Sequence, residues 1–184
     1  MKGFMKMSGE LTARIAEKIS ADWENRGYDV FYDHGKKGNN KVGKIVSWFG
    51  DEYKREAELS QLDIAIVEKG SGKIFALIEI EETTDNPKTL IGDSVGALIG
   101  ERIMFAGKRE LSVDKNTILI VLGQSKIRHQ VRNNHIQDRV MEMKSNLSTA
   151  NSEIGRVIID SFADADDLDA LLPSVLDRAF KGEL

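Results

Sequence analysis

The chain has 184 residues, of which 41% are hydrophobic and 30% are charged, and it contains no cysteine. These values fit a single domain spanning residues 1–184 with a sizeable core, and they exclude disulfides, zinc–thiolate sites and thiol chemistry. No apolar run reaches the length of a membrane span or of a signal-peptide core, so we expect a cytoplasmic protein without membrane contact.

The first third of the chain predicts a helix, a strand and a loop. Residues 8–26 carry apolar side chains at helical spacing, and residues 28–33 alternate as a half-buried strand does. Residues 34–44 are rich in Gly, Asn and Lys, which is typical of a surface loop. Residues 45–61 leave alternatives open, because IVSWF favours a strand whereas DEYKREAEL fits a helix or a polar strand.

The rest of the chain alternates strands and helices. Apolar, β-branched strands are predicted over residues 62–68 and 73–81, and the turn KGSGK joins them. The remaining predicted elements are a helix over 86–107, a buried strand over 116–123, a basic amphipathic helix over 125–147, a strand over 154–160 and a helix over 165–180. The order predicts an α/β fold in which a central mixed β-sheet is flanked by helices.

The predicted hairpin gathers carboxylates at one end. Its register sets three pairs of residues opposite each other on one face: Val67 with Phe75, Ala65 with Leu77, and Asp63 with Glu79. Glu81 follows Glu79 by two residues and therefore shares its face. Like charges this close raise one another's pKa values, and a divalent cation relieves the repulsion. Oxygen ligands at a partly open site suit Mg²⁺, with Mn²⁺ as a substitute.

An Asp on one strand, followed across a hairpin by Glu-x-Glu, resembles the PD-(D/E)XK nuclease superfamily, which includes the restriction endonucleases. The resemblance covers roughly residues 8–123 and lies as much in the α-β-β-β-α-β order as in the motif letters. Glu81 stands where most members have lysine, and a minority of active restriction enzymes carry Glu-x-Glu there.

The resemblance implies a Mg²⁺-dependent DNA endonuclease. Asp63 and Glu79 would be metal ligands, with the carbonyl of Ile80 as a further ligand. Glu81 would position or deprotonate the attacking water or hold a second cation, so the catalytic set is Asp63, Glu79 and Glu81. A fourth acid would come from Glu10, Glu17 or Glu58, and the sequence does not choose among these three. Cutting both strands requires two active sites, which predicts a homodimer.

Contacts to DNA would have to come from local basic patches, because the net charge of −4 argues against binding by bulk charge. Two segments offer such patches, the loop 36–44 and the stretch 126–139. The predicted contact residues are Lys36, Lys37, Lys41, Lys44, Arg128 and Arg132. A merely solvated surface is an open alternative for both segments.

Two other classes of function remain open. The loss of the lysine fits a catalytically inactive module that kept the nuclease fold and binds nucleic acid or protein. An α/β interaction domain in which the carboxylates are incidental is the third reading. The retained carboxylates favour the enzyme.

Overall fold

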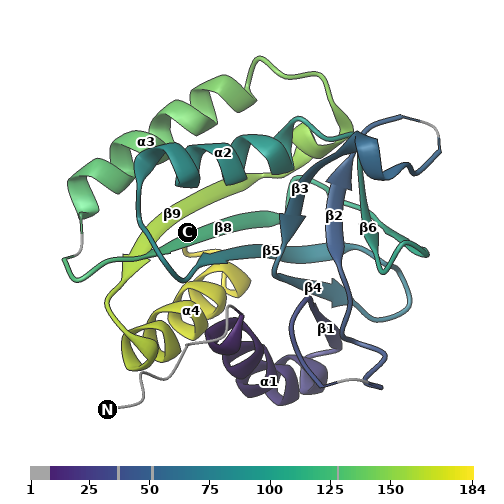
Figure 1. Ribbon diagram of the computed structural model, residues 1–184, viewed down its shortest axis with the longest axis horizontal. Coiled ribbons are helices and arrows are strands. Elements are labelled where there is room, and N and C mark those ends of the chain that lie inside the picture. Colours follow the sequence, from purple (N-terminus) through teal and green to yellow (C-terminus); the bar gives the residue numbers. More distant parts are fainter. Residues whose placement is uncertain (1–8, 37, 51, 128) are drawn as a thin grey trace, which may run out of the picture.

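The computed structural model describes residues 9–36, 38–50, 52–127 and 129–184, and it is an α/β fold built on a mixed five-stranded sheet (Figure 1). The strand order is β1-β4-β5-β8-β9. The strands are β1 (Tyr28–Tyr32), β4 (Ile64–Glu68), β5 (Ile74–Glu81), β8 (Ile118–Gln124) and β9 (Arg156–Phe162). The first three pair antiparallel, whereas β8 and β9 continue the sheet parallel to β5.

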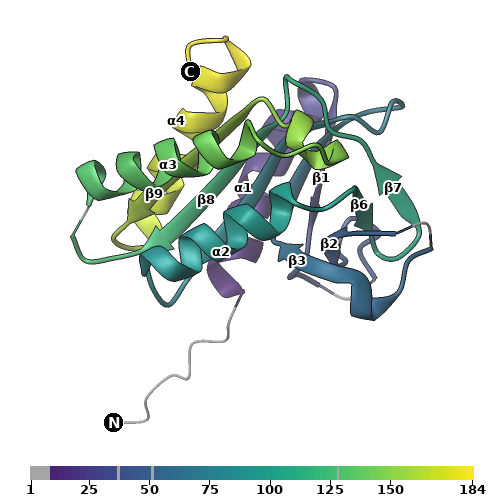
Figure 2. The same ribbon diagram turned by 90° about the horizontal axis from the view of Figure 1, so that it is seen from above.

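Four helices cover the two faces of this sheet (Figures 1 and 2). One face carries α1 (Glu10–Asn25) and α4 (Ala165–Phe180), and the other carries α2 (Pro87–Leu98) and α3 (Gln130–Lys144). Each helix buries an apolar stripe, as its sequence periodicity predicts. Two hydrophobic cores result, one on each side of the sheet.

A second, four-stranded sheet extends the α2 side of the molecule and was not predicted. Its order is β3-β2-β6-β7, with β3 (Glu58–Leu62), β2 (Ile45–Trp48), β6 (Arg102–Phe105) and β7 (Arg109–Leu111). The ambiguous stretch 45–61 therefore forms β2, a short 3₁₀ helix (Arg55–Ala57) and β3. A further 3₁₀ helix, Ala150–Glu153, precedes β9.

The predicted helix 86–107 is wrong in its second half. The helix starts as predicted, with Asn86 capping the amide of Lys88, but it ends at Leu98. At Gly100 the backbone approaches β2 so closely that an added Cβ would lie 1.9 Å from Ser47 Oγ. The chain then turns into β6, whose pairing with β2 satisfies the backbone groups that a longer helix would have used.

The predicted hairpin register is confirmed near the carboxylates and wrong near the turn. Ala65 lies opposite Leu77, as expected, but Val67 lies opposite Ile74 and not Phe75. A β-bulge at this point inserts one residue into β5. Phe75 consequently packs in the core beside α1, whereas Leu77 packs in the core on the other face.

The basic helix is shorter than expected, since α3 begins at Gln130 and not at 125. Ile136 and Val140 are buried as predicted, but Val131 is 73% exposed. The first turn of α3 therefore leaves an apolar side chain in solvent. No helix in the described residues has the length and apolar character that crossing a bilayer requires.

Candidate metal centre

The carboxylates of the predicted site lie where β4 begins and β5 ends. Asp63 precedes β4, and its backbone is held on both sides: its amide donates to the Ile78 carbonyl (3.1 Å), and its carbonyl accepts from the Asp33 amide (2.9 Å). Its side chain is fixed too, because the amide of Ile80 donates to Asp63 Oδ2 (2.8 Å). The hairpin therefore holds this carboxylate against the Glu79–Ile80 segment of β5.

Glu79 is the least compensated carboxylate of the site. Its Oε2 is buried and has no hydrogen-bond partner among the described residues. Burial raises the pKa of Glu79 well above its ordinary value, and the nearby charges of Asp63, Asp93 and Glu81 raise it further. A buried acceptor of this kind costs free energy unless a donor or a cation reaches it.

Asp63 is perturbed in the same direction. Burial, its largest cause, raises its pKa to about 7, and the charges of Asp33 and Glu82 add to the rise. The hydrogen bond from Ile80 and the charge of His34 act against this rise but do not cancel it. The raised pKa values of Asp63 and Glu79 favour their protonated forms. This indicates a site that lacks a compensating positive charge.

Glu81 is turned toward the chain that follows β5. Its Oε1 accepts from the amide of Thr83 (3.0 Å) and from the Thr83 hydroxyl (2.6 Å). Glu81 thus spends this oxygen on Thr83, although its charge still acts on Glu79. Within the described ranges, no three His, Asp or Glu side chains lie close enough together, in the positions they adopt, to hold a metal ion.

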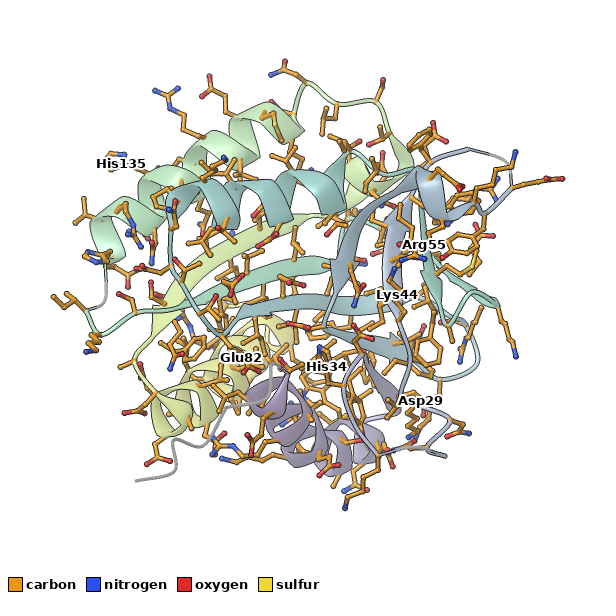
Figure 3. The ribbon with its side chains drawn as sticks, viewed as in Figure 1. Asp29, His34, Lys44, Arg55, Glu82 and His135 are labelled. Carbon is orange, nitrogen blue, oxygen red and sulfur yellow. The ribbon has the colours of Figure 1, made fainter. Side chains whose placement is uncertain are left out.

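A cavity of about 210 Å³ opens beside the carboxylates. Glu82 forms part of its wall and is held by α1, since the amide and the hydroxyl of Thr12 both donate to Glu82 Oε1 (3.1 and 3.2 Å). Figure 3 shows His34 beside Glu82 at this place. The lining residues are Gly9, Thr12, His34, Gln61, Asp63, Glu79, Ile80, Glu81, Glu82 and Thr83. The cavity is therefore predominantly polar and acidic.

A further acid near the site comes from α2 and was not predicted. Burial raises the pKa of Asp93 to about 6, and the charge of Glu81 contributes. Its own charge acts in turn on Glu79. The sequence holds a signal that would have found it, because Asp93 is the single acidic residue in the stretch 86–100. Its position among small and apolar neighbours is unusual for a solvated carboxylate.

The three acids considered for the fourth position do not line the cavity. Glu10 and Glu17 are exposed on α1. Glu58 accepts from Lys44 and from the Tyr53 hydroxyl, so its charge is compensated elsewhere.

Several residues predicted to contact DNA are ion-paired within the protein. Lys41 pairs with Glu24 and with Asp29 (3.3 Å), and Lys44 pairs with Glu58. Arg132 donates to Asp85 Oδ2 at 2.5 Å. Lys36 is exposed, whereas Lys37 and Arg128 lie outside the described residues. Figure 3 places Lys44 and His135 far apart, so the two predicted contact regions lie at different ends of the molecule.

Comparisons with protein-family models, with curated proteins and with solved structures gave no match. The interpretation of the site therefore depends on the geometry and electrostatics of this chain.

Proposed function

We propose that this protein is a Mg²⁺-dependent DNA endonuclease that hydrolyses phosphodiester bonds through Asp63, Glu79 and Glu81. The observation that carries the proposal is the buried Oε2 of Glu79, which has no partner in the described part of the chain and lies among other carboxylates. A cluster of buried acids without a counter-charge is costly to maintain by packing alone. A function that uses the negative charge explains why it is there.

The donor set fits a hard divalent cation. Carboxylate oxygens from Asp63 and Glu79 are the ligands that Mg²⁺ prefers, and the cavity leaves room for water and for a phosphate oxygen. The carbonyl of Ile80 would add a third oxygen. Mn²⁺ would serve as a substitute, since it takes the same oxygen ligands. A bound cation of this kind supplies Lewis acidity to the scissile phosphate.

The protein's own groups would have separate roles in the reaction. The Ile80 amide holds the Asp63 carboxylate in place, which reduces the reorganisation needed when substrate binds. Glu81 would orient the attacking water or accept its proton, after turning away from Thr83. Asp93, whose pKa is raised by burial and by the charge of Glu81, adds a further acid beside the site.

The chain topology supports the same proposal. Along the chain, α1, β1, β4, β5, α2 and β8 follow in the order α-β-β-β-α-β, and the carboxylates lie on β5 and at the start of β4. We propose that this core is restriction-endonuclease-like. Because cutting a duplex needs one active site for each strand, we also propose that the protein acts as a homodimer on DNA.

The test is metal-dependent cleavage of supercoiled, linear and branched DNA by the purified protein. We expect nicking with Mg²⁺ or Mn²⁺ that Asp63→Asn and Glu79→Gln each reduce by at least ~100-fold. Glu68→Gln is the matched control, because Glu68 is an exposed acid at the far end of β4. Absence of cleavage by the wild type on all three substrates would contradict the proposal.

The second candidate is a catalytically inactive module that kept this fold and binds nucleic acid or a protein. The contact between Glu81 and Thr83 favours it, since in this arrangement no three acids of the described residues are placed to hold a metal ion together. Calorimetry with Mn²⁺ separates the two candidates. The enzyme should bind the ion through Asp63, whereas the inactive module should show DNA binding without any metal requirement.

A further inference from the structure

His34 lies on the wall of the acidic cavity, in the loop that follows β1. The wall carries four carboxylates, those of Asp63, Glu79, Glu81 and Glu82, and no Lys or Arg among the described residues lines it. A divalent cation offsets two of these charges, so an incoming phosphate still faces a negative wall. Of the lining side chains that the structure describes, only His34 can offer this phosphate a cationic donor.

His34 and Glu81 lie on opposite sides of Asp63. In the sheet, β4 runs between β1 and β5. The Asp63 carbonyl accepts from the Asp33 amide on the β1 side (2.9 Å), and the Asp63 amide donates to the Ile78 carbonyl on the β5 side (3.1 Å). His34 follows Asp33 directly, whereas Glu81 is the last residue of β5. A phosphate held by a cation at Asp63 would therefore have Glu81 on one side and His34 on the other.

The imidazole of His34 has a donor that the protein does not use. No hydrogen bond joins it to another described residue, its Nε2 lies 4.0 Å from Asp33 Oδ2, and its side chain is 42% exposed. The other polar side chains of the wall already donate to carboxylates: Thr12 to Glu82, Thr83 to Glu81, and Gln61 to Asp33. The His34 side chain is thus open to a substrate that enters the cavity.

Gly9 holds the imidazole in this place. A Cβ built at Gly9 would lie 2.3 Å from Cγ of His34, so the backbone at the start of α1 packs directly against the ring. Gly9 also has a φ of 85°, in the left-handed region that favours glycine. The contact therefore depends on glycine at this position, and it fixes the ring between α1 and the cavity.

We infer that His34 is the general acid of the reaction and protonates the leaving oxygen of the scissile phosphodiester. The inference rests on the proposed function. An in-line displacement places the attacking and leaving oxygens on opposite sides of phosphorus, as Glu81 and His34 are placed about Asp63. The attacking water loses a proton to Glu81 as its oxygen bonds to phosphorus. The bond from phosphorus to the bridging oxygen breaks, and that oxygen takes the proton of the His34 imidazolium.

The test uses the purified full chain and DNA in which sulfur replaces the 3′ or the 5′ bridging oxygen of the phosphodiester that the wild type cuts. A thiolate leaves without being protonated, so a general acid is not needed for it. We expect His34→Ala to reduce cleavage of all-oxygen DNA by at least ~100-fold. The same variant should cleave one of the two sulfur-bridged substrates at the wild-type rate. His34→Gln keeps a donor but transfers no proton, so it should behave as His34→Ala does.

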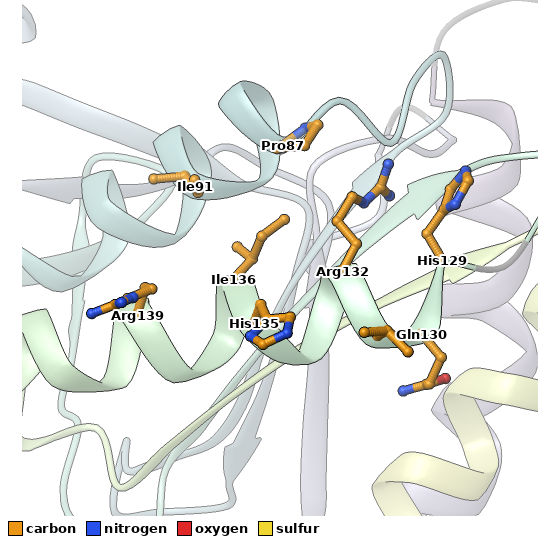
Figure 4. Close-up of a pocket in the computed structure, with 9 residues that line it drawn as sticks. Pro87, Ile91, His129, Gln130, Arg132, His135, Ile136 and Arg139 are labelled. Atoms are coloured by element: carbon orange, nitrogen blue, oxygen red, sulfur yellow. The ribbon is translucent and has the colours of Figure 1, made fainter.

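His135→Ala is the matched control. His135 is also an exposed histidine, but it lies on α3, where it lines a pocket between α2 and α3 (Figure 4). This variant should cleave all substrates as the wild type does. The affinity for DNA in the presence of a chelator and the midpoint of urea unfolding should be unchanged in both His34 variants, which separates a lost proton donor from a lost structure.

Four results would overturn the inference. Wild-type cleavage by both His34 variants, with Asp63→Asn inactive, would leave the proposed function standing and give His34 no part in it. Slow cleavage of all substrates alike would make His34 a DNA-binding or structural residue. Fast cleavage by His34→Gln alone would show that a hydrogen-bond donor suffices. A wild type that cuts no DNA would remove the proposed function, and the inference with it.

Discussion

The amide of Ile80 donates a 2.8 Å hydrogen bond to the carboxylate of Asp63, and this bond joins the start of β4 to the end of β5. The bond fixes an acid beside Glu79, whose own Oε2 has no partner within the described residues. Backbone hydrogen bonds lower the pKa values of both carboxylates, but burial outweighs them, so both pKa values remain raised.

The stability of the metal-free protein should fall as pH rises from about 4 to about 7. Over this interval an unfolded chain releases the proton of Asp63, whose ordinary pKa is 3.8, while the folded chain retains it up to about 7. The unfolded state is therefore favoured progressively, by a few kcal/mol in all, and the loss levels off above the folded pKa. Urea unfolding at pH 5 and pH 8 in the presence of a chelator measures the difference.

Asp63→Asn is the control for this pH dependence. Asn keeps an oxygen that accepts from the Ile80 amide but has no proton to release, so its stability should fall less between the two pH values. At pH 8 the variant should be more stable than the wild type. Parallel pH curves for the two proteins would show that Asp63 is not the responsible group.

Divalent metal should raise the melting temperature, and the rise should be larger at pH 8 than at pH 5. A cation binds the ionised carboxylates of the folded state, and it stabilises that state by about 2.7 kcal/mol at a concentration one hundred times its dissociation constant. Glu79→Gln should lose most of the rise, whereas Glu68→Gln should keep it. An equal rise in all three proteins would indicate nonspecific binding.

Substitution of Glu81 should distinguish an active enzyme from a catalytically inactive module. Glu81→Gln retains the size and an acceptor for Thr83 but removes the charge, so the fold and the DNA affinity should be preserved. Cleavage should drop by at least ~100-fold, the scale of losing a positioned acid or base. Glu81→Lys should reduce cleavage if the wild type is an active enzyme. It should restore cleavage if the wild type is a catalytically inactive module. Cleavage by the Lys variant but not by the wild type would establish the inactive module.

Two glycines of the same segment should respond in opposite ways to alanine. A Cβ at Gly100 would lie 1.9 Å from Ser47 Oγ and 2.8 Å from Asn151 Nδ2, so Gly100→Ala should destabilise by about 1–3 kcal/mol. A Cβ at Gly92 meets nothing within 4 Å, so Gly92→Ala should stabilise α2 by up to about 1 kcal/mol. Equal effects in urea unfolding would contradict the close contact between Gly100 and β2.

Local sequence patterns were sufficient to predict the structure of segments whose conformation depends on their own periodicity. The helix predicted over residues 165–180 has the observed bounds, because its apolar spacing and the Asp164 cap are both local. The predicted pairing of Ala65 with Leu77 is observed, because the bulge at Phe75 offsets the one-residue shift next to the turn. The predicted register also placed Asp63 beside Glu79, and the hydrogen bond from Ile80 to Asp63 agrees with that position.

Tertiary structure alone decided the features that depend on contacts between distant segments. The bulge at Phe75, the second sheet and the end of α2 at Leu98 arise from pairing and packing with other elements, which no local pattern encodes. Asp93 approaches the site only because α2 packs against β3 and β8. Lys41, Lys44 and Arg132 read as free cations in the sequence, but the fold places Glu24, Glu58 and Asp85 against them. A charge pattern shows which residues can bind an anion, and only the folded chain shows which of them already do.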